Sequence, residues 1–357
     1  MIRVLVVEDS PTARALIVSI LSAEHDLHVV AEATTGTQAV ELAQRLVPDL
    51  ITMDVHMPEM DGLEATKQIM ARSPRPIIIV SSAARSDDVA LSLEATRAGA
   101  LMVLPKPEGP GAPGFASESR QLVSMVRAMS QVKVVRRHGA APPFTALPTP
   151  QSRPAYTLGA AAGGGATPVR VVAIGASTGG PAALRTLLAD MPSGFPVPIL
   201  IVQHIANGFT QGLAQWLDGG TPLRVKVAEL SERLAPATVY IAPDDRHLGI
   251  QLDAYGDIRT VLSSAPPVGA FRPSASFLFQ SAAEVIGAAA LAVILTGMGD
   301  DGVAGLLALK ARGGRVIAQD EASSVIYGMP REALRAGVVD VSLGINLVAR
   351  KLVELTQ

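Results

Sequence analysis

Three short apolar runs in the second half of this chain each lead to a side chain that can do chemistry. The runs are residues 169–177, 198–204 and 291–302, and they deliver Ser177, His204, and the pair Asp300 and Asp301. Runs of β-branched and aliphatic residues bounded by glycine are typical of strands buried in a parallel sheet. Because residues just past the carboxyl ends of such strands face one crevice, we expect a serine, a histidine and an aspartate to meet there. These are the parts of a nucleophilic hydrolase.

The first 106 residues alternate apolar strand patterns with helical patterns. Strands are predicted at Val4–Val7, Val29–Ala31, Leu50–Met53, Ile77–Val80 and Leu101–Leu104. Helices are predicted at Thr12–Ala23, Gln38–Leu46, Gly62–Ala71 and Val89–Ala98, with a fifth from about Ser117 to Met129. Five strand–helix repeats predict one parallel sheet with helices on both faces.

Charge and composition divide the chain into three parts. Residues 1–118 carry a net charge of −7, residues 119–167 carry +6 without one acidic residue, and the remainder carries −1. The middle part is rich in proline and glycine, which is typical of a flexible linker. We therefore predict one domain at 1–131, a basic linker at 132–167, and a second strand–helix alternation in a domain at 168–357. Both domains are predicted to be doubly wound α/β sheets.

The composition also excludes several kinds of chemistry. The chain has no cysteine, so disulfides, thiolate nucleophiles and cysteine-ligated metals are excluded. The amino terminus turns acidic too soon for a signal peptide. The longest uncharged apolar stretch, Val285–Gly299, is shorter than the roughly 20 residues of a membrane helix. We expect a soluble, cytoplasmic protein with no direct membrane insertion.

Charged and hydroxyl side chains follow the predicted strands of the first domain. Glu8 and Asp9 follow the first strand, Asp54 follows the third, Ser81 ends the fourth, and Lys106 follows the fifth. Clustered carboxylates repel one another unless a hard cation such as Mg²⁺ lies among them. With a metal and Lys106 nearby, Asp54 could accept a phosphoryl group. The alternative is that each carboxylate only caps a helix, but the set recurs at the correct strand ends.

These residues resemble a response-regulator receiver domain across about residues 1–130. The resemblance implies a flavodoxin-like fold and phosphorylation at Asp54 by a histidine kinase. It implies that Asp9 and Asp54 bind Mg²⁺, with Glu8 and a backbone carbonyl near His56 in support. It also implies that Ser81 is the hydroxyl switch residue and that Lys106 contacts the phosphoryl group. Val103 departs from the pattern, because many receivers carry an aromatic switch residue there.

The turn Gly175-Ala-Ser177-Thr-Gly179 fits the G-x-S-x-G pattern, which exposes a serine hydroxyl between a strand and a helix. Such a turn is about as typical of a phosphate site or a tight corner. His204 ends the next strand and is the predicted partner of the serine, although spacing alone also allows a satisfied surface histidine. His247 is preceded by Asp244 and Asp245, so the order serine–acid–histidine of α/β-hydrolases is formally available. Because His247 lies in a turn after a separate short strand, a structural role is favoured for it over a catalytic one. Asp300 or Asp301 supplies the acid, and the residues alone do not choose between them.

Residues 168–350 resemble the catalytic domain of chemotaxis protein-glutamate methylesterases. The stretches that carry the resemblance are Gly175–Pro181, Val202–His204, Leu295–Gly302 and Ile317–Pro330. The resemblance implies a Rossmann-like domain with Ser177 as nucleophile, His204 as general base and Asp301 as triad acid. It also implies that Thr178 and the backbone N–H of Met298 lie at the substrate carbonyl. Arg272 is implied as a further substrate contact. Ser276 stands where related sequences often carry an acid.

The two resemblances imply a phosphorylation-activated serine hydrolase. It would release methanol from glutamate methyl esters on the cytoplasmic domains of methylated chemoreceptors, and members of the family also deamidate receptor glutamines. No cofactor is expected at the hydrolase site.

Three other functions share some of these sequence features. A DNA-binding response regulator needs a basic output domain, and the third part carries −1, so no nucleic-acid partner is expected. A dinucleotide-binding domain needs a G-x-G spacing that the serine turn lacks. A catalytically silent scaffold protein would carry the same motifs as the esterase, and only a measurement of esterase activity distinguishes the two.

Overall fold

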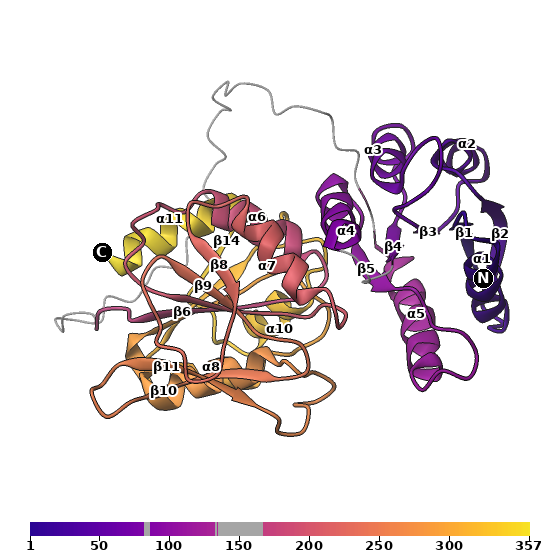
Figure 1. Ribbon diagram of the computed structural model, residues 1–357. Coiled ribbons are helices and arrows are strands. Elements are labelled where there is room, and N and C mark those ends of the chain that lie inside the picture. Colours follow the sequence, from indigo (N-terminus) through magenta and orange to yellow (C-terminus); the bar gives the residue numbers. More distant parts are fainter. Residues whose placement is uncertain (82–85, 133, 135–166) are drawn as a thin grey trace, which may run out of the picture.

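The computed structural model in Figure 1 describes residues 1–81, 86–132, 134 and 167–357. The predicted linker at 132–167 therefore lies almost wholly outside the described residues. Within the described ranges, no helix is both long enough and apolar enough to span a membrane.

The amino-terminal domain is a parallel five-stranded sheet in the order β2-β1-β3-β4-β5. Its strands are β1 Ile2–Val7, β2 Leu27–Ala33, β3 Leu50–Met53, β4 Ile77–Ser81 and β5 Met102–Pro105. Its helices are α1 Pro11–Ser22, α2 Gly36–Leu46, α3 Gly62–Arg72, α4 Ser86–Ala98 and α5 Phe115–Met129. This is the order of flavodoxin-like folds, and the prediction of a doubly wound parallel sheet is confirmed.

Local sequence fixes where three of these helices begin. The side chains of Ser10, Thr35 and Asp61 each accept a hydrogen bond from a backbone N–H in the first turn of α1, α2 and α3. Such caps satisfy donors that a helix leaves unpaired at its start. Helices α1 and α2 therefore start within four residues of the ends of β1 and β2, whereas a longer loop, residues 54–61, separates β3 from α3.

The carboxyl-terminal domain contains a parallel seven-stranded sheet in the order β14-β13-β12-β6-β7-β9-β8. Its strands are β6 Val171–Ala176, β7 Ile199–Gln203, β8 Arg224–Val227, β9 Thr238–Ile241, β12 Ala290–Ile294, β13 Arg315–Gln319 and β14 Val341–Leu343. Its helices are α6 Gly180–Ala189, α7 Thr210–Asp218, α8 Ala275–Val285, η1 Gly287–Ala289, α9 Val303–Ala311, α10 Met329–Arg335 and α11 Ile345–Thr356. The predicted Rossmann-like α/β class is confirmed.

The prediction of an uninterrupted strand–helix alternation in this domain was wrong between α7 and α8. Strands β8 and β9 are parallel neighbours with no helix between them, and an antiparallel hairpin follows, formed by β10 His247–Leu252 and β11 Ile258–Ser263. The hairpin turn forms because the carboxylate of Asp253 accepts the backbone N–H groups of Tyr255 and Asp257. Its buried face packs against α8, so it covers a face that a helix would otherwise cover.

The order of the strands sets the position of the crevice. The chain passes from β6 to β7 on one side and later returns to β12 on the other side of β6. Such a reversal opens a crevice outside the carboxyl ends of the central strands. Ser177 follows β6, His204 follows β7, and Asp301 follows β12, so all three residues lie at this crevice.

The two domains pack against each other through α4 on one side and α6 and α7 on the other (Figure 1). A Cβ added at Gly212 of α7 would lie 2.3 Å from a methyl carbon of Val89 in α4, so only a glycine allows this approach. The indole N–H of Trp216 donates to Glu94 Oε1 at 2.7 Å across the same interface. Residues of both domains share one buried apolar cluster.

Candidate functional site

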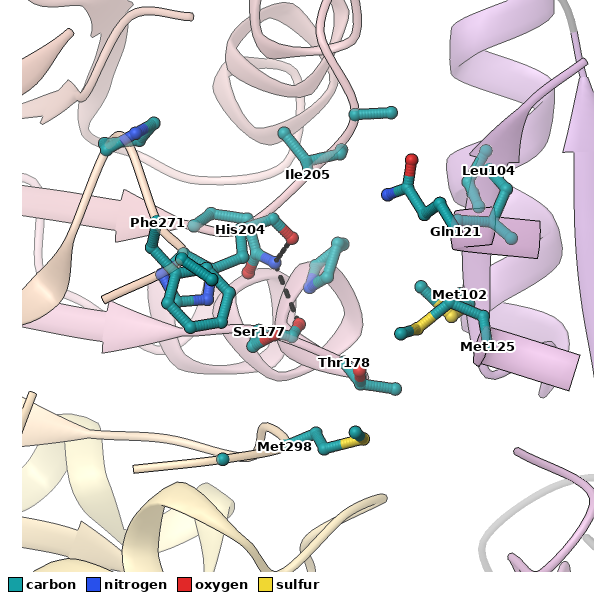
Figure 2. Close-up of a pocket in the computed structure, with 18 of the residues that line it drawn as sticks. Met102, Leu104, Gln121, Met125, Ser177, Thr178, His204, Ile205, Phe271 and Met298 are labelled. Carbon is teal, nitrogen blue, oxygen red and sulfur yellow. Dashed lines mark hydrogen bonds between the residues drawn. The ribbon is translucent and has the colours of Figure 1, made fainter. Parts of the chain in front are cut away.

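The loop that carries Ser177 turns sharply from β6 into α6. Gly179 has a φ of 77°, and a Cβ there would lie 2.5 Å from the Cβ of Val325. Both the positive φ and the close approach require glycine at this position. The backbone N–H of Ser177 donates to Thr296 O at 3.0 Å, which anchors the turn to the loop after β12. The turn leaves the Ser177 side chain at the mouth of the crevice (Figure 2).

The structure joins His204 to Asp301 and leaves Asp300 apart. His204 Nε2 lies 2.9 Å from Asp301 Oδ2. Asp301 is buried, with 6% of its surface exposed, whereas Asp300 is exposed to solvent. The geometry therefore singles out the second aspartate of the pair, a choice that the residues alone left open.

The carboxylate of Asp301 lies at the start of α8. It accepts hydrogen bonds from the Ser274 hydroxyl and from the backbone N–H groups of Ala275, Ser276 and Gly302. Burial alone would raise the pKa of Asp301, but its hydrogen bonds to His204, Ser274 and Ala275 outweigh burial and hold the pKa well below its usual range. A carboxylate that stays ionised can fix the tautomer of the histidine ring.

The second ring nitrogen of His204 is free to act as a base. Because Nε2 carries the hydrogen shared with Asp301, Nδ1 holds the lone pair, and it is buried without a hydrogen-bond partner in the described part of the chain. The same described residues show no hydrogen bond between the Ser177 hydroxyl and this ring. The ring of Phe271 stacks on the imidazole with centroids 4.1 Å apart and planes 3° from parallel. Phe271 was not predicted from the sequence, where its place directly before Arg272 in Phe-Arg-Pro-Ser was the only signal for it.

Ser177, His204, Thr178 and Met298 line one cavity of about 360 Å³ (Figure 2). Among the described residues, no acceptor takes a hydrogen bond from the backbone N–H of Thr178 or of Met298, whereas the Ser177 N–H is used. Unused N–H groups beside a nucleophile can hold a developing oxyanion. The carbonyl of Thr178 accepts from the Thr296 hydroxyl at 2.9 Å, which orients this peptide.

Arg272 lines the same cavity, but its guanidinium is already occupied by the protein. Its Nε and Nη2 donate to Asp245 Oδ1, and its Nη1 donates to the carbonyls of Ser264 and Ala265. Arg272 therefore holds the loop that carries Phe271, and a direct contact to substrate stays a prediction.

His247 lies outside this cluster. It is fully buried, its Nε2 is 3.1 Å from the carbonyl oxygen of Pro266, and its ring stacks on Phe277. It contacts the loop after β11 through Pro266 and is not among the residues that line the Ser177 cavity.

The amino-terminal domain supplies part of the cavity wall. The residues from its α4, β5 and α5 that line the cavity are Thr96, Met102, Val103, Leu104, Gln121 and Met125. Figure 2 shows Met102, Leu104, Gln121 and Met125 facing the Ser177 side of the crevice. The cavity beside Ser177 is therefore shared by the two domains.

A second polar crevice lies at the carboxyl ends of β1, β3 and β5. Asp54 is 3% exposed, and Lys106 Nζ lies 2.9 Å from Asp54 Oδ2 and 3.0 Å from Glu8 Oε1. Burial raises the pKa of Glu8 and of Asp54 above their usual range, although Lys106 opposes the shift. Burial would lower the pKa of Lys106, but its hydrogen bonds to Asp54 and Glu8 outweigh this and raise it.

The carboxylates of this crevice fit a divalent cation. Glu8, Asp9 and Asp54 each offer an oxygen within 4.8 Å of the others. Glu8 Oε2 is buried and accepts no hydrogen bond in the described part of the chain, although Lys106 Nζ lies 2.9 Å away. Three carboxylate oxygens this close together are the kind of ligand set that a hard cation such as Mg²⁺ prefers.

The other residues predicted for this crevice lie around it. Ser81 is buried at the end of β4, and His56 is exposed in the loop after β3. Val103 in β5 pairs with Ile79 in β4 and also lines the cavity that holds Ser177. Val103, which stands where many receivers carry an aromatic residue, therefore contributes to the wall of the Ser177 cavity.

Comparison with known proteins identifies both halves of the chain. Residues 172–352 match the family model described as CheB methylesterase, and residues 4–112 match the response regulator receiver domain. A protein-glutamate methylesterase/protein-glutamine glutaminase of Myxococcus xanthus is 52% identical over 98% of this chain and 96% of its own length. One from Anaeromyxobacter dehalogenans is 50% identical over 99% and 98%. The crystal structure of the Thermotoga maritima CheB methylesterase catalytic domain is 41% identical, with a TM-score of 0.52, and covers 53% of this chain and 100% of that chain.

Proposed function

The chain belongs to the CheB methylesterase family and carries a response regulator receiver domain, and on this premise we propose that it hydrolyses glutamate methyl esters on chemoreceptors with Ser177, His204 and Asp301. The observation that carries the proposal is the contact of 2.9 Å between His204 Nε2 and the buried Asp301, with His204 lining the same cavity as Ser177. The relatives named above are protein-glutamate methylesterases and protein-glutamine glutaminases. The substrates would be the methylated cytoplasmic domains of these receptors, which places the enzyme in the cytoplasm.

The reaction would begin with attack of Ser177 Oγ on the ester carbonyl carbon. His204 Nδ1 takes the hydroxyl proton, and Asp301 stabilises the imidazolium that forms. The N–H groups of Thr178 and Met298 hold the oxyanion. When the tetrahedral intermediate collapses, the ester C–O bond breaks and His204 returns the proton to the leaving oxygen, so methanol departs.

Water then releases the acyl group from Ser177. His204 takes a proton from the water molecule as its oxygen attacks the acyl carbonyl, and it returns that proton to Ser177 Oγ as the acyl bond breaks. The receptor keeps a glutamate carboxylate, so each turnover adds a negative charge. An amide follows the same steps with ammonia as the leaving group, and we include glutamine deamidation in the proposal on this ground.

The receiver domain would control this reaction through Asp54. Its carboxylate attacks the phosphorus of a phosphohistidine on the chemotaxis histidine kinase, the N–P bond breaks, and an aspartyl phosphate forms. Mg²⁺ bound by Asp9 and Asp54, with Glu8 in support and a carbonyl near His56, would neutralise charge on the phosphoryl oxygens. Lys106 donates to the phosphoryl group, and the Ser81 hydroxyl hydrogen-bonds to it.

Phosphorylation would act by loosening the contact between the domains. Residues of α4, β5 and α5 line the cavity beside Ser177, so the docked receiver narrows access to the nucleophile. A phosphorylated receiver that binds the catalytic domain less tightly would shift the population of molecules toward an arrangement in which the Ser177 cavity is open.

Mass spectrometry of methylated receptor membranes tests the chemistry. Incubation with the wild-type chain should convert methyl-glutamate peptides to glutamate peptides, and Ser177→Ala should leave them methylated. Equal conversion by both proteins would exclude Ser177 as the nucleophile. No conversion by either protein, with the fold intact, would favour a binding role in place of catalysis.

A further inference from the structure

The side chain of Gln203 links the backbones of the proposed nucleophile and the proposed base. Gln203 ends β7 and is buried, with 4% of its surface exposed. Its Nε2 donates to Ser177 O and to His204 O, each at 2.8 Å. One amide group therefore bridges the loop after β6 and the loop after β7, at the two residues whose separation the reaction depends on.

The orientation of this amide is fixed by its partners. Both contacts of Nε2 are carbonyl oxygens, so a flipped amide would place an oxygen against two acceptors. In the observed orientation Oε1 is buried and has no hydrogen-bond partner in the described part of the chain. An unsatisfied buried acceptor costs stability, so the double contact of Nε2 is kept despite that cost.

Gly180 provides the space in which the amide lies. A Cβ added at Gly180, the first residue of α6, would lie 1.9 Å from Gln203 Oε1 and 2.8 Å from Gln203 Cδ. The Gly180 N–H donates to Ser177 O at 2.8 Å. The carbonyl of Ser177 therefore receives one bond from its own turn and one from the neighbouring strand.

Backbone hydrogen bonds pair β6 with β7, but they do not set the distance between Ser177 and His204. The N–H of His204 donates to Ala176 O at 3.0 Å, which continues the parallel pairing of β6 with β7 as far as Ala176. Beyond that point the hydrogen bond from the Gln203 amide to Ser177 O joins the two loops. Catalytic side chains must be held within about 0.5 Å of their productive geometry by such supporting residues.

We propose that Gln203 is a positioning residue that sets the separation of Ser177 and His204 and thereby the efficiency of proton transfer between them. The inference rests on the proposed serine-hydrolase function. It adds a residue that touches neither substrate nor reacting atoms and acts through the two backbones.

Gln203→Met tests this role because it keeps the length and most of the volume of the side chain and removes both hydrogen bonds. In the full chain activated with a small phosphodonor and Mg²⁺, kcat for ester hydrolysis should fall about 10- to 100-fold with KM unchanged, since about 1 Å of misplacement costs rate and not affinity. Labelling of Ser177 by a fluorophosphonate should slow by a similar factor. Gln215→Met, at an exposed position in α7, is the control and should change neither kcat nor the rate of Ser177 labelling.

A second pair of variants tests the same amide by changing Gly180, which borders it. Gly180→Ala should displace the Gln203 amide and lower kcat as Gln203→Met does. In a Gln203→Ala background the clash with the amide is removed and the Cβ of Ala176, at 3.0 Å, is the next neighbour, so adding Gly180→Ala should cost little further activity. This non-additivity would show that the two positions act through one contact.

The outcomes separate the positioning role from simple stability and from the proposed function. Normal kcat and labelling in folded Gln203→Met would overturn the positioning role, as would a rise in KM alone. If Gln203→Met does not fold, additive losses in the Gly180→Ala pair would also overturn it. No fluorophosphonate labelling of the wild-type chain would instead count against the serine-hydrolase function itself.

Discussion

At the scale of single residues, the site depends on how Asp301 and His204 are held. Five hydrogen bonds converge on the Asp301 carboxylate, from His204, Ser274, Ala275, Ser276 and Gly302. Four of them come from groups that do not titrate and that keep the carboxylate in place. The carboxylate is thus ready to orient the imidazole before substrate arrives.

Asp301→Asn should lower kcat by about three to four orders of magnitude, because an amide cannot hold the productive tautomer of His204. Steady-state release of methanol measures this loss. The neighbouring Asp300→Asn is the matched control and should retain wild-type activity, since Asp300 is exposed and outside the cluster. If the two substitutions had equal effects, Asp301 could not be the triad acid.

The pKa of Asp301 also makes a prediction for stability. Because the pKa lies below the ordinary value of 3.8, the folded state holds the ionised carboxylate more strongly than the unfolded state does. This contribution to stability is fully present above about pH 4 and is lost as the pH falls below it. Denaturant unfolding of wild type and Asp301→Asn should therefore differ most above that pH and converge below it. A difference that grows on acidification would contradict the assignment.

Phe271 offers a further residue-scale prediction, through its stack on the His204 ring. Phe271→Leu removes the aromatic face and should lower kcat about 2- to 10-fold, as expected from the strength of aromatic pairs. Phe271→Tyr keeps the ring and should restore the rate. A tyrosine variant as slow as the leucine variant would exclude stacking as the cause.

At the scale of elements, strand ends and helix starts place the functional groups. The helix start of α8 holds Asp301, the turn before α6 holds Ser177, and the end of β7 holds His204. In the receiver, the far end of α5 is tied to the loop before β2, because Arg127 donates to Asp26 and Glu24. The guanidinium lowers the pKa of Asp26 to about 2.

This ion pair can be tested by titration. In wild type the Asp26 carboxyl should titrate near its pKa of about 2, and in Arg127→Gln its pKa should return toward the ordinary value of 3.8. The contribution of the pair to stability should thus be present above about pH 4 and lost as the pH falls toward 2. Carboxyl carbon resonances recorded by NMR measure both midpoints. Identical midpoints would mean that the pair does not form in solution.

How much of the element layout could be predicted depended on the kind of element. Strands such as Leu50–Met53 were predicted to the residue, since continuous apolar runs bounded by polar turns are a local signal. The hairpin of β10 and β11 was missed, because its pairing depends on a turn at Asp253 and on contact with α8. The stack of Phe271 on His204 and the bridge made by Gln203 were missed for the same reason. They join loops that are distant in sequence and meet only in the folded chain.

At the scale of the whole molecule, the receiver and the catalytic domain share an interface that includes the cavity of Ser177. Trp216 is the only tryptophan of the chain and donates to Glu94 across that interface. Its fluorescence therefore reports whether the domains are docked.

Glu94→Ala should loosen docking by about 1 kcal/mol, which shifts the equilibrium between docked and open forms about fivefold. Basal activity without phosphodonor should rise, activation by phosphodonor should shrink, and the emission of Trp216 should shift toward that of an exposed indole. Glu41→Ala on α2, away from the interface, is the control. Shifted emission with unchanged basal activity would show that docking does not limit access to Ser177.

The measurement that tests the central claim most directly is release of methanol from methylated receptor membranes, with and without a small phosphodonor and Mg²⁺. Wild type should release methanol and should do so faster with phosphodonor. Ser177→Ala should release none, and Asp54→Ala should keep only the basal rate. Wild-type protein that releases no methanol in either condition would contradict the account, and activation that survives in Asp54→Ala would contradict its regulatory half.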